Sequence, residues 1–220
     1  MPISQAMRDR HSVRQYLDKP IPENIRQALD SYVISINAAG GMHIQLIYDE
    51  PACYNTRMAH YGHFENVRNY IALVGPKGSE LEEKAGYYGE MIVLKAQELG
   101  LNTCWTALSR GKSRSVILPG EKEVILISLG YGATQGSARK SKRAAQISDY
   151  APDAPDWYRE GIEAALLAPT AINQQKFRIS RQGNKVAIKT SGIGPCLKID
   201  LGIVKFHFEI GAGKDNFEWA

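Results

Sequence analysis

The sequence predicts a mixed fold of the α/β or α+β class, because helical and strand-like segments alternate along all 220 residues. Segments with apolar side chains at helical spacing indicate amphipathic helices. Short β-branched or continuous apolar runs indicate strands, and glycine or proline separates many of these segments. The length allows one large domain or two small ones, with enough chain for a real hydrophobic core.

The first half of the chain predicts both helices and strands. Residues 22–36 form a predicted helix, because Pro22 suits a first-turn position and the apolar side chains share one face. Residues 43–48 alternate in polarity and residues 70–74 are continuously apolar, so both predict strands.

A long helix and a buried strand follow. Residues 81–99 carry apolar side chains at helical spacing and end at Gly100, a usual helix-terminating residue. Residues 124–129 form a continuous apolar run between charged residues and glycine, which is typical of a buried central strand.

The remaining chain begins with a polar stretch, residues 133–155, that indicates a crossing segment or linker. Residues 157–167 predict an amphipathic helix, residues 176–180 and 185–190 a hairpin, and residues 201–210 a last helix.

A weak internal repeat accompanies this order. The segment PENIRQALDSYVI resembles PDWYREGIEAALL in length, in its Pro and Arg positions and in apolar phase. Likewise GEMIVLKAQELG resembles DLGIVKFHFEIG. Chance similarity between amphipathic helices is common, so duplication and coincidence both stay open.

Composition excludes several classes of protein. The net charge of +4 permits an anionic ligand but falls short of the dense basic face of a nucleic-acid-binding protein. Cys53, Cys104 and Cys196 are few and far apart, which argues against a disulfide framework and a structural zinc site. The chain has no apolar run long enough for a bilayer and no signal-peptide pattern, so we expect a cytoplasmic protein without membrane contact.

The most informative cluster lies near the N-terminus, where Arg10, His11, Ser12 and Arg14 can all bind an anion. Two guanidinium groups with a hydroxyl suit a phosphate, which needs both neutralising charge and hydrogen-bond donors. The alternative is a solvated basic N-terminal helix. Spacing alone leaves both interpretations open.

Two later segments carry comparable chemistry. Residues 168–175, APTAINQQ, follow a predicted helix and supply neutral donors and acceptors that suit the edge of a heteroaromatic ring. A helix C-terminus with an Asn/Gln turn would have the same composition. Residues 139–143, RKSKR, are a solvated linker or the second half of a phosphate clamp.

Other motifs give weaker functional signals. Gly130, Gly132 and Gly136 follow a predicted strand but lack the apolar helix that a dinucleotide loop requires. His60 and His63 have no obvious third ligand, which argues against a metal site. We find no nucleophile elbow and no catalytic dyad.

Four segments occur in an order that resembles the FMN-dependent nitroreductase family, of the NADH oxidase and flavin reductase type. They are RHSVR followed by KPIP, the helix GYYGEMIVLKAQELGLNTCW, the run EVILISLGYG and the basic stretch after it. The resemblance covers most of residues 8–145. It implies an α+β, sandwich-like nitroreductase fold with a central mixed, mainly antiparallel sheet flanked by helices.

One departure from the family pattern concerns its Ala-Pro-Ser-x-x-Asn-x-Gln element, which usually follows the first long helix. Residues 35–41 hold that position here and lack the proline, whereas residues 168–175 carry the element. Ordinary members form intertwined dimers in which the partner supplies this loop to the flavin. The resemblance therefore implies a variant with two pseudo-repeated halves, residues 1–150 and 151–220, in one compact molecule. One FMN site per chain would form between the halves, and a monomer becomes possible, although a homodimer is not excluded.

The resemblance also implies the FMN contacts. The N-terminal cluster would hold the phosphate, the basic run would add a later contact, backbone groups after the long helix would pass under the isoalloxazine, and the displaced element would contact the phosphate–ribityl side or the ring edge. These residues are Arg10, His11, Ser12, Arg14, Lys140, Lys142, Thr106, Ala107, Leu108, Pro169, Thr170, Ala171 and Asn173.

The implied activity is that of an FMN-dependent oxidoreductase. A hydride would pass from NADH or NADPH through the flavin to a nitroaromatic, a quinone or a similar small acceptor, without a catalytic acid or base from a side chain. The alternative is a flavin-binding or small-ligand-binding protein of the same fold without reductase activity.

Overall fold

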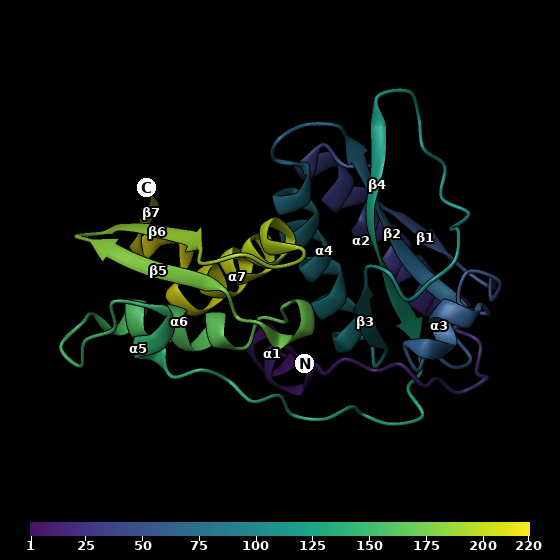
Figure 1. Ribbon diagram of the computed structural model, residues 1–220, viewed down its shortest axis with the longest axis horizontal. Helices are drawn as coiled ribbons and strands as arrows, with labels where there is room; N and C mark the ends of the chain where they lie inside the picture. The colour runs from purple at the N-terminus through teal and green to yellow at the C-terminus, as the bar shows by residue number, and fades with distance from the viewer. The chain divides into compact units, whose positions relative to one another are not determined.

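The chain divides into two units, each with its own β-sheet (Figure 1). The computed structural model describes residues 1–220. Unit 1 contains Met1–Leu81 and Ile92–Ala138, and unit 2 contains Glu82–Met91 and Arg139–Ala220.

A four-stranded antiparallel sheet in the order β1-β2-β4-β3 forms the centre of unit 1. The strands are β1 (Gln45–Ile47), β2 (Asn69–Pro76), β3 (Asn102–Thr106) and β4 (Glu121–Gly130). Strand β2 is buried on both faces along almost its whole length, which explains its continuous apolar sequence.

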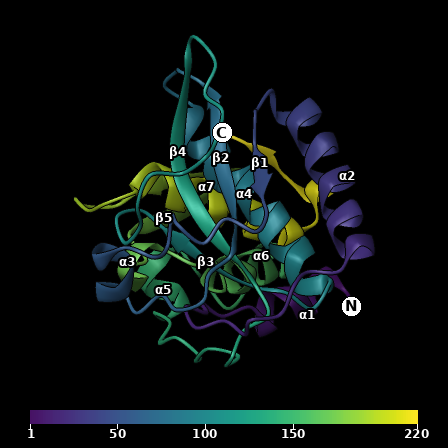
Figure 2. The same cartoon turned by 90° about the vertical axis from the view of Figure 1, so that its right-hand side faces the viewer.

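Different elements cover the two faces of this sheet. Figures 1 and 2 show α2 (Glu23–Gly40) and the C-terminal part of α4 (Leu81–Glu98) on one side, and α3 (Arg57–Tyr61) on the other. On the α3 side, Tyr70 and Ala72 of β2 join a buried cluster of aromatic and aliphatic side chains. Because side chains alternate along a strand, the residues between them face the two long helices.

Unit 2 combines helices with a three-stranded sheet in the order β5-β6-β7. Strands β5 and β6 form an antiparallel hairpin, and β6 pairs with β7 in parallel. The elements are α5 (Ala144–Ile147), α6 (Asp156–Leu166), the 3₁₀ turn η1 (Ala171–Asn173), β5 (Phe177–Gln182), β6 (Lys185–Thr190), α7 (Leu197–Ala212), the 3₁₀ turn η2 (Lys214–Asn216) and β7 (Glu218–Trp219).

Glycines bring the first turns of α4 and helix α7 into close contact within unit 2. A Cβ atom added at Gly86 would lie 2.0 Å from the carbonyl oxygen of Ile199, and one at Gly202 would lie 2.0 Å from that of Glu83. Only glycine permits this approach of two backbones. Beside it, His207 Nε2 lies 2.9 Å from Glu90 Oε1, and both side chains are fully buried.

The predicted fold class is confirmed: the molecule is a mixed α+β protein whose central sheet is antiparallel and flanked by helices. The predicted helices and strands all form, with boundaries shifted by a few residues. Strand β3 and the short elements α1 (Ile3–Asp9), α3, α5 and β7 were not expected from the sequence. No helix of the structure is both long and apolar enough to cross a membrane.

The expected internal duplication stays a prediction. Each of the stretches α2 to α4 and α6 to α7 contains two antiparallel strands between long helices. The two units divide the chain near residue 138 and within α4, so they do not coincide with the halves 1–150 and 151–220.

Candidate functional site: two sets of polar residues

The basic N-terminal cluster lies on an extended segment. Helix α1 ends at Asp9, and Arg10 already has extended backbone angles. Ser12 bridges to Thr103 in parallel, and the Val13 N–H donates to the Thr103 carbonyl at 3.0 Å. The alternative interpretation, a solvated basic N-terminal helix, is therefore wrong for residues 10–14, which run along the outer edge of β3.

This extended backbone places three polar side chains of the segment on one side. Because side chains alternate, Arg10, Ser12 and Arg14 point away from the side that buries Val13. All three act on the same group, the thiol of Cys104. Burial raises the pKa of this thiol, whereas the charges of Arg14 and Arg10 and a hydrogen bond with Ser12 lower it.

The two arginines differ in exposure. Only 2% of Arg10 is exposed, whereas Arg14 is exposed. Ser12 and His11 are half-buried. The exposure of the hydrogen-bond donors therefore increases along the segment, from the buried guanidinium of Arg10 through the Ser12 hydroxyl to the exposed guanidinium of Arg14.

A glycine-containing loop supports the segment from its other side. The Leu17 N–H donates to the Tyr131 carbonyl at 2.8 Å, and the Ala133 N–H donates to the Gln15 carbonyl at 2.8 Å. A Cβ atom added at Gly136 would lie only 2.7 Å from the Cβ of His11. The glycines considered as a dinucleotide loop thus allow close packing against the N-terminal cluster.

Thr106, Ala107 and Leu108 lie where β3 ends. Thr106 is buried and its hydroxyl donates to the Cys104 carbonyl at 3.2 Å. Ala107 is exposed, and 80% of Leu108 is exposed. Thr106 is thus the last residue of the strand that carries Cys104, and Ala107 and Leu108, which follow the strand, face solvent.

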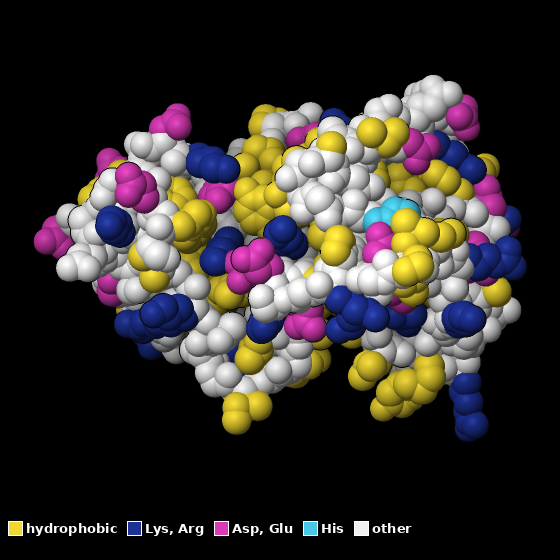
Figure 3. Space-filling model, turned by 90° about the horizontal axis from the view of Figure 1, so that it is seen from above, with side chains coloured by type: hydrophobic (Ala, Val, Ile, Leu, Met, Phe, Trp, Pro, Cys, Tyr) yellow, Lys and Arg dark blue, Asp and Glu magenta, His cyan; other side chains and the backbone are white.

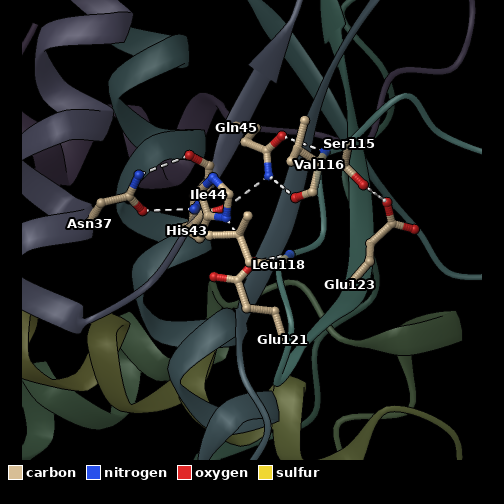
Figure 4. A network of polar contacts seen from close by, with 9 residues as sticks. All are labelled: Asn37, His43, Ile44, Gln45, Ser115, Val116, Leu118, Glu121 and Glu123. Carbon is tan, nitrogen blue, oxygen red and sulfur yellow. Dashed lines mark hydrogen bonds and ion pairs between the residues drawn. The ribbon is translucent and has the colours of Figure 1, made fainter.

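Polar contacts fix the long connection that follows, residues 107–120 (Figure 4). The side-chain amide of Gln45 donates to the Val116 carbonyl at 2.7 Å and accepts from its N–H at 2.8 Å. The Glu121 carboxylate lies 2.8 Å from His43 Nδ1 and accepts from the Leu118 N–H at 2.8 Å. The second half of the connection is therefore held to unit 1 by hydrogen bonds at Val116 and Leu118.

The second set of predicted residues lies together in unit 2. The Asn173 amide donates to the Lys140 carbonyl at 2.9 Å, and Lys142 Nζ donates to the Gln175 carbonyl at 2.9 Å. Thr170 Oγ1 accepts from the Gln175 N–H at 3.0 Å. The basic run and the displaced loop thus form one connected element. Lys140 keeps an exposed side chain, whereas the ammonium group of Lys142 is used to hold the loop.

A buried carboxyl group lies under the same loop. Asp200, in the first turn of α7, is 5% exposed. It accepts from the Ala171 N–H at 2.9 Å and from the Gln174 amide at 2.7 Å. Burial raises its pKa to about 6, and these two hydrogen bonds oppose the shift. The loop that contains Pro169 to Gln175 is therefore anchored at Asp200 as well as at the basic run.

Sequence reasoning missed Gln175 and Asp200 as members of this arrangement. Gln175 belongs to the quoted motif, but nothing in its spacing distinguishes a buried amide from an exposed one. Helix α7 also carries Lys198, Lys205, His207 and Glu209, so no signal in the sequence distinguishes Asp200 from its other polar residues.

Comparison with known proteins identifies the family. The family model described as "Putative TM nitroreductase" matches residues 2–212. The chain belongs to this nitroreductase family. No curated protein matches it.

Solved structures show the same fold as this member of the family. A "putative nitroreductase" from Thermotoga maritima is similar with a TM-score of 0.71 and 23% identity, over 98% of this chain and 85% of that one. A "putative nitroreductase in complex with FMN" from Desulfovibrio desulfuricans has a TM-score of 0.53 and 20% identity, over 67% of this chain and 95% of that one. A "putative NADH oxidase" from Clostridium acetobutylicum has a TM-score of 0.50 and 18% identity, over 64% and 96% of the two chains.

Proposed function

We propose that this nitroreductase-family protein binds FMN and transfers a hydride from NADH or NADPH to a small acceptor such as a nitroaromatic or a quinone. The observation that supports this proposal most directly is the shared side of Arg10, Ser12 and Arg14 on the segment beside β3. Family membership and the FMN complex of the Desulfovibrio protein point in the same direction.

The donor set suits the phosphate of FMN. Two guanidinium groups can neutralise the dianion and donate paired hydrogen bonds, and the Ser12 hydroxyl adds a neutral donor. Arg10 is held in place by burial, so little side-chain freedom is lost when it meets a ligand. Bound FMN would supply the redox chemistry, because it can accept a hydride from a nicotinamide and pass it to an oxidised substrate.

The role that remains for this chain is binding and orientation. In the proposal Arg10, Ser12 and Arg14 hold the phosphate with His11 beside them, and backbone groups at Thr106, Ala107 and Leu108 border the ring.

In the proposal, the polar residues of unit 2 also bind FMN. Lys140, Pro169, Thr170, Ala171 and Asn173 contribute flavin contacts. We propose that Lys142 acts indirectly, because its ammonium group donates a hydrogen bond to the Gln175 carbonyl and so holds the loop. The donor NADH or NADPH and the acceptor would use the same site in turn, which requires no acid or base from a side chain.

The charge distribution supports a small-molecule enzyme over a nucleic-acid-binding protein. Figure 3 shows Lys and Arg side chains scattered among acidic and uncharged ones on the face in view. A nucleic-acid-binding surface would gather them into a continuous stripe with aromatic side chains between.

The test of cofactor binding uses two arginines of the same segment. We expect purified protein to bind FMN, and Arg14→Ala to weaken binding by roughly 10- to 100-fold, because a charge-assisted hydrogen bond is worth about 1.5–3 kcal/mol. The matched control is Arg8→Ala, which removes an exposed arginine from α1 and should leave the affinity unchanged. Quenching of flavin fluorescence measures both. A protein that takes up no FMN, or two variants with equal affinity loss, would contradict the proposal.

A further inference from the structure

Gln175 stands out in unit 2 because it is buried and yet uses almost every polar atom it has. Only 4% of the residue is exposed. Its Oε1 accepts from the Lys142 N–H at 2.8 Å, and its Nε2 donates to the Lys140 carbonyl and to Asn173 Oδ1, both at 3.0 Å. Its own N–H and carbonyl are bonded to Thr170 and Lys142.

These bonds join two segments that are far apart in sequence. The side chain of Gln175 contacts residues 140 and 142 on one segment and residue 173 on the other. The Asn173 amide completes the link by donating to the same Lys140 carbonyl at 2.9 Å. The carbonyl of Lys140 thus receives two hydrogen bonds, which fix the backbone directly behind an exposed lysine side chain.

The backbone of the loop needs this support. Ile172, Asn173 and Gln175 have φ angles of 48°, 56° and 46°, in the left-handed region that non-glycine residues seldom adopt. Such conformations persist only where the surroundings fix them. Hydrogen bonds from Gln175 and to Asp200 are the contacts that fix them here.

We propose that Gln175 is a positioning residue, which holds Lys140 and Asn173 as one preformed pair of polar side chains for the flavin. This inference rests on the proposed function, because it assigns Lys140 and Asn173 to FMN. Gln175 itself is buried and would act only through these two neighbours. Preformed donors lose less conformational freedom on binding, so the contribution of Gln175 is to affinity.

The test is a double-mutant cycle on FMN affinity. Gln175→Met keeps the length of the side chain and removes its hydrogen bonds, and we expect it to weaken FMN binding about tenfold. In a Lys140→Ala/Asn173→Ala background the same substitution should change affinity less than about twofold, because the side chains it positions are gone. Equal losses in both backgrounds, or no loss in the parent protein, would overturn the inference.

A matched variant separates positioning from general stability. Tyr87→Phe removes a hydrogen bond to Glu209 elsewhere in unit 2, so we expect a lower melting temperature and unchanged FMN affinity. If Gln175→Met does not fold, Gln175→Glu replaces it in the same cycle, because it keeps the acceptor for the Lys142 N–H and loses the two donated bonds.

Hydrogen exchange of the Lys142 amide in flavin-free protein gives a readout that does not depend on the cofactor. We expect Gln175→Met to lose protection at this amide, whereas an unchanged amide would overturn the inference. A parent protein that binds no FMN would refute the proposed function. Tight FMN binding that is insensitive to Gln175→Met would refute only the positioning role.

Discussion

Arg10 and Arg14 share one side of the N-terminal segment but differ in their surroundings. We therefore expect them to contribute differently to stability. Arg10 is buried, so its stem and guanidinium are part of the packing of unit 1. Arg14 is exposed. The charges of both arginines lower the pKa of the same Cys104 thiol.

We therefore expect two different outcomes from alanine at these positions. Arg10→Ala should lower the free energy of unfolding by about 1–3 kcal/mol and also weaken FMN binding, because it removes buried contacts and charge together. Arg14→Ala should change the unfolding free energy by less than about 0.5 kcal/mol. Urea unfolding of the flavin-free proteins measures both, and equal stability losses would contradict this division.

Asp200 gives a prediction for pH dependence. Its pKa is raised from 3.8 to about 6 by burial, so the folded chain binds this proton more tightly than the unfolded chain does. The resulting stabilisation is complete below about pH 4 and is lost as the pH rises through about 6, up to about 3 kcal/mol in total. Asp200→Asn should remove this part of the pH dependence of unfolding. An unchanged slope between pH 4 and 6 in the variant would contradict the assignment.

At the scale of elements, short side-chain contacts and glycines decide how the long elements pack. Within unit 2, Gly86 and Gly202 let the first turns of α4 meet α7 at backbone distance. Within unit 1, Gln45, Glu121 and their partners hold the connection between β3 and β4 (Figure 4).

Substitution of one glycine tests the close packing of α4 and α7. Gly86→Ala should destabilise the protein by at least about 2 kcal/mol, because the new Cβ would meet the Ile199 carbonyl oxygen at 2.0 Å and a main chain must shift. Gly78→Ala is the matched control: its Cβ would meet no atom within 4 Å, so stability should be unchanged or slightly higher. Thermal unfolding compares them, and equal melting temperatures would refute the close contact.

The long elements could be predicted from sequence because periodicity and terminating residues are local signals. Residues 22–36 and 81–99 carry such patterns, and α2 and α4 form there. Strand β3 could not be predicted in this way, because NTCWT has no alternation and its strand character comes from pairing with β4. The same holds for residues 10–14: neighbours two apart share a side only in an extended chain, and β3 provides the edge that keeps this chain extended.

The candidate site was predictable as a set of residue types but not as a geometry. The sequence indicated Arg10, Ser12 and Arg14, and also Lys140 and Asn173, from their chemistry and from family resemblance. That Lys142 is used within the protein, and that Gln175 connects both segments, depends on hydrogen bonds across some thirty residues of sequence.

At the scale of the whole molecule, the chain is a member of the nitroreductase family and divides into two units. We propose one FMN per chain, and we expect stoichiometric flavin even in protein that sediments as a monomer. The sequence halves expected to replace a dimer partner stay a prediction, which the ratio of flavin to chain at known oligomeric state would test.

Anaerobic titration of the FMN-loaded protein with NADH and with NADPH tests the central claim most directly. We predict that at least one dinucleotide bleaches the flavin absorption band in a one-to-one ratio, and that a nitroaromatic or quinone then restores it. Bound FMN that neither dinucleotide reduces would contradict the oxidoreductase assignment and would favour a flavin-binding protein of the same fold.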